Sequence, residues 1–279
     1  MGNLALIIAS VLVSLGQLDA KPSPAEILDG KRTVFLGDSI TQAGTYVSCS
    51  SYYLQRLYPG KTFDIYPLGL SSETVSGLSE HGHAGGRFPR PCLFERLGRL
   101  LVKVKPDVVF ACYGINCGIY QPLDTKRFAA YQNGVKRLIK DCRAAGVQQI
   151  YLVTPPIYDA ATQEGAFNYD NVMTAYAKWQ MTLAGEGVKV IGLHSAMRAA
   201  RDARSEVFSK DKVHPGKEGH LFMARTILTG LGIQVPEEDF ATISKDPLYK
   251  VVDRMRGLRG KQWMNHIGYT RQKRVTPQA

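Results

Sequence analysis

The sequence is poor in the features that identify metal-binding or membrane-spanning proteins. Its longest apolar run without a charge covers residues 4–15, and about twelve residues are too few to cross a bilayer as an anchor. We therefore expect no stable membrane insertion. The spacing of its cysteines matches no zinc site, so we expect no bound metal either. The cysteines are Cys49, Cys92, Cys112, Cys117 and Cys142.

The net positive charge is small outside the C-terminal end. The formal net charge is +11, and residues 245–279 hold nine Lys or Arg against two Asp, a surplus of seven. This asymmetry indicates a basic C-terminal extension, residues 233–279, and gives no reason to expect nucleic-acid binding by the whole protein. Basic residues interleaved with aromatic ones can bind polyanions or glycans. We instead expect the extension to pack on the domain near Trp263 and to be disordered beyond about Gln272.

Residues 1–20 have the pattern of a secretory signal peptide. The apolar run is followed by Ala20, a small residue suited to cleavage. No Lys or Arg precedes the run, which leaves an N-terminal strand or a buried helix as the alternative. A signal peptide implies a periplasmic or secreted protein, in which one or two disulfides could form. Residues 21–30, with two prolines, are interpreted as a linker.

Strand and helix patterns alternate over residues 31–232. Apolar runs predict strands near residues 33–36, 62–66, 108–113, 149–154 and 188–193. Helical spacing predicts helices from about Ser48, after Thr74, and over residues 93–103, 128–145, 171–184 and 217–231, with a connector after residue 193. Right-handed crossovers then give a five-stranded parallel sheet covered on both faces. The predicted fold class is a three-layer α/β sandwich.

Polar residues and glycine stand where these strands end. Ser39 follows the first strand at a turn into a helix, Gly69 follows the second strand, and Asn116 follows the third. Asp211 and His214 lie on the loop before the last helix. Because the carboxyl ends of parallel strands share one edge of the sheet, these residues should converge. Taken alone, Ser39 would be interpreted as a helix cap.

Together these residues provide the chemical groups that acyl transfer requires. The reaction needs a nucleophilic hydroxyl, an imidazole that accepts its proton, and a carboxylate that orients the imidazole. It also needs hydrogen-bond donors for the oxyanion. Asp211 precedes His214 by three residues, so a single turn can bring the carboxylate to the imidazole.

The order and spacing of these residues resemble the SGNH, or GDSL-type, hydrolases over about residues 31–232. The four blocks of that family appear here as Gly37-Asp38-Ser39-Ile40, Gly69, Gly114-Ile115-Asn116 and residues 211–215. The resemblance implies a flavodoxin-like fold, cleavage of esters or thioesters, and no cofactor. It also implies Ser39 as nucleophile, His214 as general base and Asp211 as its orienting partner. The oxyanion hole would consist of the backbone amides of Ser39 and Gly69 and the side-chain amide of Asn116.

One residue departs from the family's pattern. Members of the family often have Asp after the block asparagine, where this chain has Cys117. That Asp is not part of the triad, so we expect altered hydrogen bonding in the loop and retained hydrolysis.

A polar, glycine-rich insertion over residues 80–91 offers candidate substrate contacts. It is either a solvated loop or a lip of the substrate pocket, since long loops at this edge of a sheet often bind substrate. The candidate residues are His81, His83, Arg87 and Arg90. Of the other histidines, His194 is interpreted as structural, and His220 and His266 are weak candidates.

Three functions compete on these observations. The first is an exported esterase that acts on short acyl groups, above all acetyl esters of carbohydrate, because the insertion is polar. The second is a lysophospholipase or thioesterase on the same fold, which would need a long apolar groove. The third is a non-catalytic protein that binds glycans or polyanions through the basic extension. The complete set of Ser39, Asp211 and His214 argues against the third.

Overall fold

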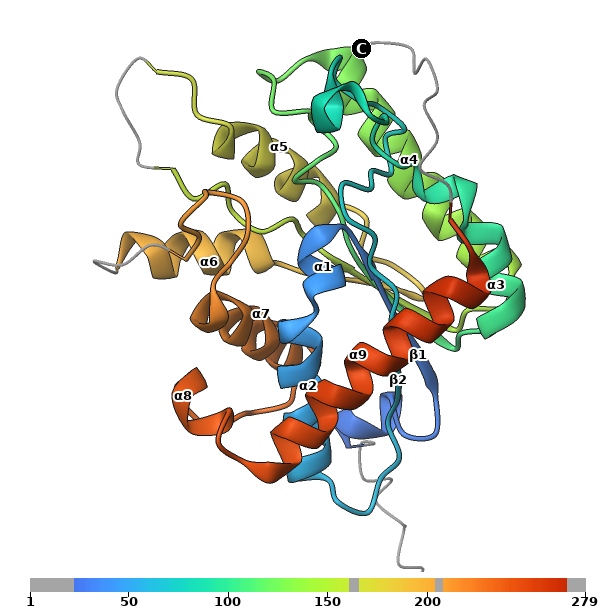
Figure 1. Ribbon diagram of the computed structural model, residues 1–279, viewed down its shortest axis with the longest axis vertical. Coiled ribbons are helices and arrows are strands. Elements are labelled where there is room, and N and C mark those ends of the chain that lie inside the picture. The colour runs from blue at the N-terminus through green and yellow to red at the C-terminus, as the bar shows by residue number, and fades with distance from the viewer. Residues whose placement is uncertain (1–22, 161–165, 204–207, 270–279) are drawn as a thin grey trace, which may run out of the picture.

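A computed structural model of the chain describes residues 23–160, 166–203 and 208–269, and its centre is a single parallel sheet (Figure 1). The strand order is β2-β1-β3-β4-β5, and every neighbouring pair is parallel. The strands are β1 (Arg32–Gly37), β2 (Asp64–Pro67), β3 (Val108–Cys112), β4 (Gln149–Val153) and β5 (Val188–Ile191). The predicted α/β fold with a five-stranded parallel sheet is confirmed.

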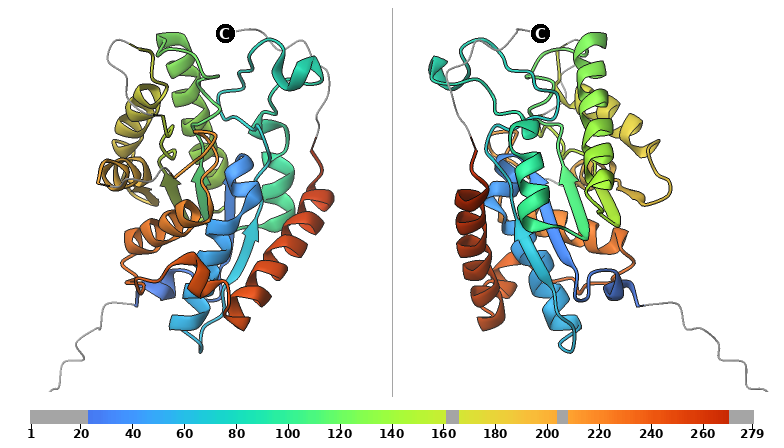
Figure 2. Two further views of the ribbon diagram at one scale, coloured as in Figure 1. Left: turned by 60° about the vertical axis from the view of Figure 1, so that its left-hand side comes forward. Right: turned by 90° about the vertical axis from the view of Figure 1, so that its right-hand side faces the viewer.

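Helices cover both faces of the sheet (Figure 2). On one face α2 packs on α7, and α6 also contacts α7. On the other face lie α3, α4 and α5, and the stacked rings of Tyr131 and Tyr176, with centroids 4.1 Å apart, join α4 to α5. The main helices are α1 (Ser39–Ala43), α2 (Thr45–Leu57), α3 (Leu97–Val104), α4 (Thr125–Ala144), α5 (Asp170–Met181), α6 (Leu193–Asp202) and α7 (Lys217–Gly230), and three short 3-10 helices are η1 (Pro24–Ile27), η2 (His83–Gly86) and η3 (Leu93–Glu95).

Aromatic side chains pack in register across the three central strands. Phe35 of β1, Phe110 of β3 and Tyr151 of β4 stand on one row of the sheet, with stacked rings 4.6 Å apart at each step. All three side chains are buried. The strands read as continuous apolar runs because both faces of the sheet are covered. This packing supports the sheet whose carboxyl edge carries the predicted site residues.

Two predictions about local structure are wrong. Residues 75–82, directly after Thr74, are not helical; instead Thr74 bridges Cys92 as an extended pair, and a Cβ at Gly134 of α4 would lie only 2.0 Å from the carbonyl oxygen of Val75. Close packing against α4 thus holds this segment extended. The expected connector after residue 193 is α6, whose residues Leu193 and Met197 are buried one turn apart.

The C-terminal extension packs on the domain. After α8 (Phe240–Ile243), the long helix α9 (Pro247–Ile267) lies along α2 and the edge strand β2 (Figure 1). The ring of Trp263 meets that of Tyr66 edge-on at 5.3 Å, which confirms the predicted packing near Trp263. The predicted signal peptide and the tail beyond Gln272 lie outside the described residues.

The five cysteines are free thiols, so none of the disulfides that export would permit is formed. Cys49, Cys112, Cys117 and Cys142 are buried. Among the described helices, none combines the length and the apolar character needed to cross a membrane.

Candidate active site

The turn from β1 into α1 places Ser39 at the carboxyl edge of the sheet. Asp38 caps the helix, since its carboxylate accepts a hydrogen bond from the N–H of Ile40 at 3.0 Å. A Cβ at Gly37 would lie 1.9 Å from Oγ1 of Thr41, so only glycine permits this tight turn. Ser39 is therefore the first residue of α1, with its side chain partly exposed.

Ser39, His214 and Asp211 form a continuous chain of hydrogen bonds. Oγ of Ser39 lies 2.8 Å from Nε2 of His214, and Nδ1 of His214 lies 2.7 Å from Oδ2 of Asp211. The other carboxylate oxygen accepts the backbone N–H groups of Val213 at 3.0 Å and His214 at 2.8 Å. Lys212 adopts a left-handed conformation, φ +70°, which closes this short turn. The structure thus brings all three predicted triad residues together.

The carboxylate of Asp211 stays ionised in this setting. Partial burial by itself raises its pKa, but the hydrogen bonds from the backbone and imidazole of His214 and from Val213 outweigh that effect and lower the pKa to about 2. The side chains of His214 and Asp211 are 50% and 57% exposed, so substrate can approach the imidazole from solvent.

Gly69 lies beside this turn on the loop after β2. The N–H groups of its neighbours Leu68 and Leu70 donate to the carbonyls of Phe35 and Gly37 on β1, at 2.8 and 2.9 Å. A Cβ at Gly69 would lie 2.3 Å from the backbone nitrogen of Gln42. The loop can approach α1 this closely only because residue 69 has no side chain.

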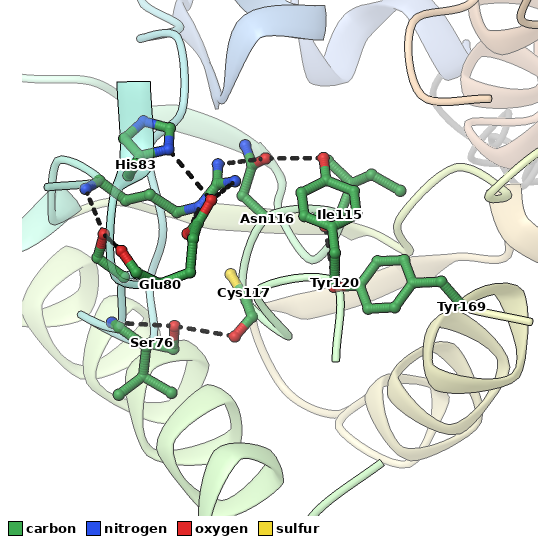
Figure 3. Close-up of polar contacts among 11 residues, drawn as sticks. Ser76, Glu80, His83, Ile115, Asn116, Cys117, Tyr120 and Tyr169 are labelled. Atoms are coloured by element: carbon green, nitrogen blue, oxygen red, sulfur yellow. Dashed lines mark hydrogen bonds and ion pairs between the residues drawn. The ribbon is translucent and has the colours of Figure 1, made fainter. Parts of the chain in front are cut away.

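Asn116 is buried on the loop after β3, and its side chain is oriented by two donors (Figure 3). Its Oδ1 accepts a hydrogen bond from Nη1 of Arg90 at 2.8 Å and from the hydroxyl of Tyr120 at 3.2 Å. Its Nδ2 is buried and has no partner among the residues that the structure describes. An amide N–H that no described protein group satisfies can donate to a bound ligand, which agrees with the role predicted for Asn116.

The four candidate substrate contacts in the insertion differ in position. Nε and Nη2 of Arg90 and the ring of His83 all bind Glu80, and Arg90 is buried. Arg87 is exposed and donates to the carbonyl of Ala84, and His81 is exposed. Only these last two present their side chains to solvent.

Sequence reasoning assigned no role to Asp38, Glu80 or Tyr120. Asp38 lies inside the Gly-Asp-Ser block, so its place in that motif could have marked it as a residue of the site. Its burial raises the pKa of the carboxyl to about 7, although the hydrogen bond from Ile40 opposes this shift. The sequence offered no such signal for Glu80 and Tyr120, because their roles depend on contacts with distant residues.

Cys117 contributes its backbone to the loop rather than a reactive thiol. Its N–H donates to the carbonyl of Gly114 at 2.8 Å, and its own carbonyl accepts the hydroxyl of Ser76 at 3.2 Å (Figure 3). Complete burial raises the pKa of the thiol to about 12, so the sulfur is protonated at neutral pH.

The other histidines lie outside the triad. Nε2 of His194 bonds to Oδ1 of Asp170 at 3.1 Å in a buried pair, in agreement with a structural role. His220 stacks on Tyr46 with ring centroids 6.0 Å apart, and burial lowers its pKa to about 4. His266 is exposed on α9. No group of three or more metal-ligating side chains gathers within the described ranges.

The sequence pattern of the GDSL-like Lipase/Acylhydrolase family matches residues 35–221, a span that includes Ser39, Gly69, Asn116, Asp211 and His214. The chain belongs to this family. It is therefore a carboxylic ester hydrolase. None of the curated proteins matches the chain.

Solved structures of this hydrolase fold resemble the chain. A variant of Axe2, an acetyl-xylooligosaccharide esterase from Geobacillus stearothermophilus, is 22% identical with a TM-score of 0.61, over 76% of this chain and 99% of that one. Axe2 itself, an acetylxylan esterase, has a TM-score of 0.55 at 22% identity over the same shares. The gut microbial diltiazem-metabolizing enzyme BT4096 is 17% identical with a TM-score of 0.56, over 73% of this chain and 47% of its own.

Proposed function

We propose that this hydrolase removes short acyl groups, above all acetyl, from carbohydrate esters, with Ser39 as its nucleophile. The hydrogen-bonded chain from Asp211 through His214 to Ser39 carries the proposal, because it supplies base, orienting carboxylate and nucleophile in contact.

In the proposed reaction, Oγ of Ser39 attacks the ester carbonyl while Nε2 of His214 takes its proton. Asp211 holds the imidazole in the required orientation and stabilises its positive charge. The oxyanion accepts hydrogen bonds from the backbone N–H groups of Ser39 and Gly69 and from Nδ2 of Asn116. His214 then protonates the leaving alcohol. In the second half of the reaction, water takes the place of the alcohol. His214 accepts a proton from the water as it attacks the acyl-enzyme and then returns that proton to Oγ, which releases the acid and restores Ser39.

A cavity with both polar and apolar lining beside the oxyanion glycine could hold a hydrophilic alcohol. The cavity measures about 230 Å³ and lies between the loop of Gly69 and helix α9. Its polar side chains include two cations and no carboxylate, and they are Gln42, Arg256, Lys261, Asn265 and Tyr269. Sugar hydroxyls can bond to these groups, whereas a long acyl chain would remove them from water.

The resemblance to Axe2 supports the same substrate class. Variants of Axe2 described as catalytic mutants replace a serine, an aspartate and a histidine, and the last two are three residues apart, as Asp211 and His214 are here. By that analogy the present chain would also act on acetylated sugars.

One observation favours the lipid alternative. Val251, Met255 and Leu258 stand on one side of α9 at helical spacing and are 56%, 48% and 53% exposed. Arg254 and Lys261 are exposed on the same helix. An apolar ridge with neighbouring cations suits the surface of an anionic membrane, where a lysophospholipase would find its substrate.

A series of p-nitrophenyl esters from acetate to dodecanoate, run beside acetylated sugars, separates the two functions. We expect kcat/KM to fall from acetate to octanoate. A lipid enzyme would gain about 0.8 kcal/mol for each buried methylene, or about 5 kcal/mol over six of them. A rise of about a hundredfold along the series, which corresponds to about 2.7 kcal/mol, would therefore contradict the carbohydrate proposal.

We also propose that the protein is exported, on the strength of the apolar run in residues 1–20. N-terminal sequencing of the protein from its native host tests this. A mature chain that begins near Lys21 is expected, and one that retains residues 1–20 would contradict export.

A further inference from the structure

The side-chain amide of Asn116 can serve an oxyanion only if its nitrogen, and not its oxygen, faces the substrate. The two ends of a carboxamide have nearly the same shape, so its orientation depends on its hydrogen-bond partners. Arg90 and Tyr120 both donate to Oδ1, at 2.8 and 3.2 Å. A reversed amide would set its NH2 group against the guanidinium, two donors facing each other in a buried place. The observed orientation leaves Nδ2 as the available donor.

Glu80, Ser79 and Tyr120 fix the position of Arg90. Its Nε and Nη2 each donate to a carboxylate oxygen of Glu80 at 2.6 Å, a two-pronged ion pair. Its backbone N–H donates to the hydroxyl of Ser79 at 2.9 Å, and its guanidinium lies 5.3 Å from the centre of the Tyr120 ring. The side chain is 6% exposed. A substrate could bond to this guanidinium only by displacing Glu80 or Asn116.

We infer that Arg90 is a positioning residue that acts through Asn116, with Glu80 fixing Arg90 in turn. The inference rests on the proposed role of Asn116 in the oxyanion hole. Arg90 fixes which end of the amide faces the reacting carbonyl. Its positive charge also draws electrons toward Oδ1, which makes the N–H groups on Nδ2 stronger donors. Both effects matter most when negative charge develops in the transition state.

A double-mutant cycle with p-nitrophenyl acetate tests the inference. The variants are Arg90→Met, Asn116→Ala and the double variant, with Arg137→Met as the control because Arg137 is an exposed arginine of α4 that pairs with Asp141. We expect Asn116→Ala to lower kcat by about a hundredfold to a thousandfold. Arg90→Met should lower kcat at least about tenfold with KM nearly unchanged. In the Asn116→Ala background it should have almost no further effect, because residues that act as one unit are not additive.

The active fraction of each preparation is measured by titration of the reactive serine, which separates a misfolded enzyme from a slow one. If Arg90→Met does not fold, Arg90→Lys and Tyr120→Phe replace it in the cycle. Arg90→Lys keeps the charge and loses the planar fork, and Tyr120→Phe removes the second donor to Oδ1.

Two results would overturn the inference. A raised KM with unchanged kcat in the Arg90 variants would make Arg90 a substrate contact. Full additivity with Asn116→Ala would show that Arg90 acts independently of that amide. Failure of the proposed function looks different, because wild-type enzyme would then turn over no acetyl ester, or the Asn116→Ala variant would keep its kcat.

Discussion

Glu73 and Arg96 form a two-pronged ion pair in which neither side chain is exposed to solvent. Both contacts measure 2.7 Å, and the hydroxyl of Tyr113 donates to the same carboxylate at 2.6 Å. Arg96 also donates to the carbonyl of Leu68 at 2.8 Å. The pair therefore ties the loop that carries Gly69 to the end of β3 and to the segment before α3.

Removal of one partner of this pair should be strongly destabilising. We expect Arg96→Leu to lower the free energy of unfolding by about 3–5 kcal/mol, because an unpaired buried carboxylate remains. Urea titration measures the change. The control is the pair of Arg56 with Glu238, whose side chains are 37% and 20% exposed, and Arg56→Leu should cost about 1 kcal/mol. A double variant, Glu73→Leu with Arg96→Leu, should recover part of the loss, and equal losses for Arg96→Leu and Arg56→Leu would contradict this account.

Ser39→Ala should abolish ester hydrolysis without loss of stability. Within the part of the chain that the structure describes, the only hydrogen bond of this side chain joins its hydroxyl to His214, and the cap of α1 comes from Asp38 instead. Turnover of p-nitrophenyl acetate and the melting temperature are measured together, with Ser244→Ala as the control. Retention of more than a few per cent of wild-type kcat would refute Ser39 as nucleophile.

Gly69→Ala should reduce kcat sharply, because the new Cβ would meet the backbone of α1 at Gln42, 2.3 Å away, and displace the loop. Gly98 of α3 gives a matched control, since a Cβ there meets nothing within 4 Å. Gly98→Ala should leave activity unchanged and raise stability by up to about 1 kcal/mol. Equal activity in the two variants would show that the approach of Gly69 to α1 is not needed.

Asp38→Asn should become more stable relative to wild type as pH rises. Burial raises the pKa of Asp38 from 3.8 to about 7, so the folded protein holds this proton more tightly than the unfolded chain. Wild type therefore loses stability between about pH 4 and pH 7, and the variant does not, while asparagine can still cap the helix. Unfolding free energies across this range measure the difference.

The control for that experiment is Asp239→Asn at the cap of α8. Hydrogen bonds from Thr242 lower the pKa of Asp239, so this carboxyl is ionised in both states above about pH 5, where most of the Asp38 effect develops. Its difference from wild type should stay constant there. A constant difference for Asp38→Asn as well would show that its carboxyl is not buried in the protonated form.

The sequence alone predicts those features that depend on local residue patterns. The central strands β1, β3 and β4 could be predicted because they are buried on both faces, and the convergence of Ser39 with His214 follows from parallel topology. The extended form of Thr74 could not be foreseen, since it depends on the close approach of α4 at Gly134. The hydrogen bond from Arg90 to Asn116 joins residues 26 positions apart and has no local signature.

The buried free thiols can serve as intrinsic probes of structural opening in this enzyme. A thiol reagent can reach Cys49, Cys117 or Cys142 only when the surrounding structure opens, because burial both shields these sulfurs and raises the pKa of each to about 12. The three report on separate places, namely α2, the loop of Asn116 and α4. The relative alkylation rates at these sites would therefore distinguish a local opening of the catalytic loop from global unfolding, in unmodified wild-type protein.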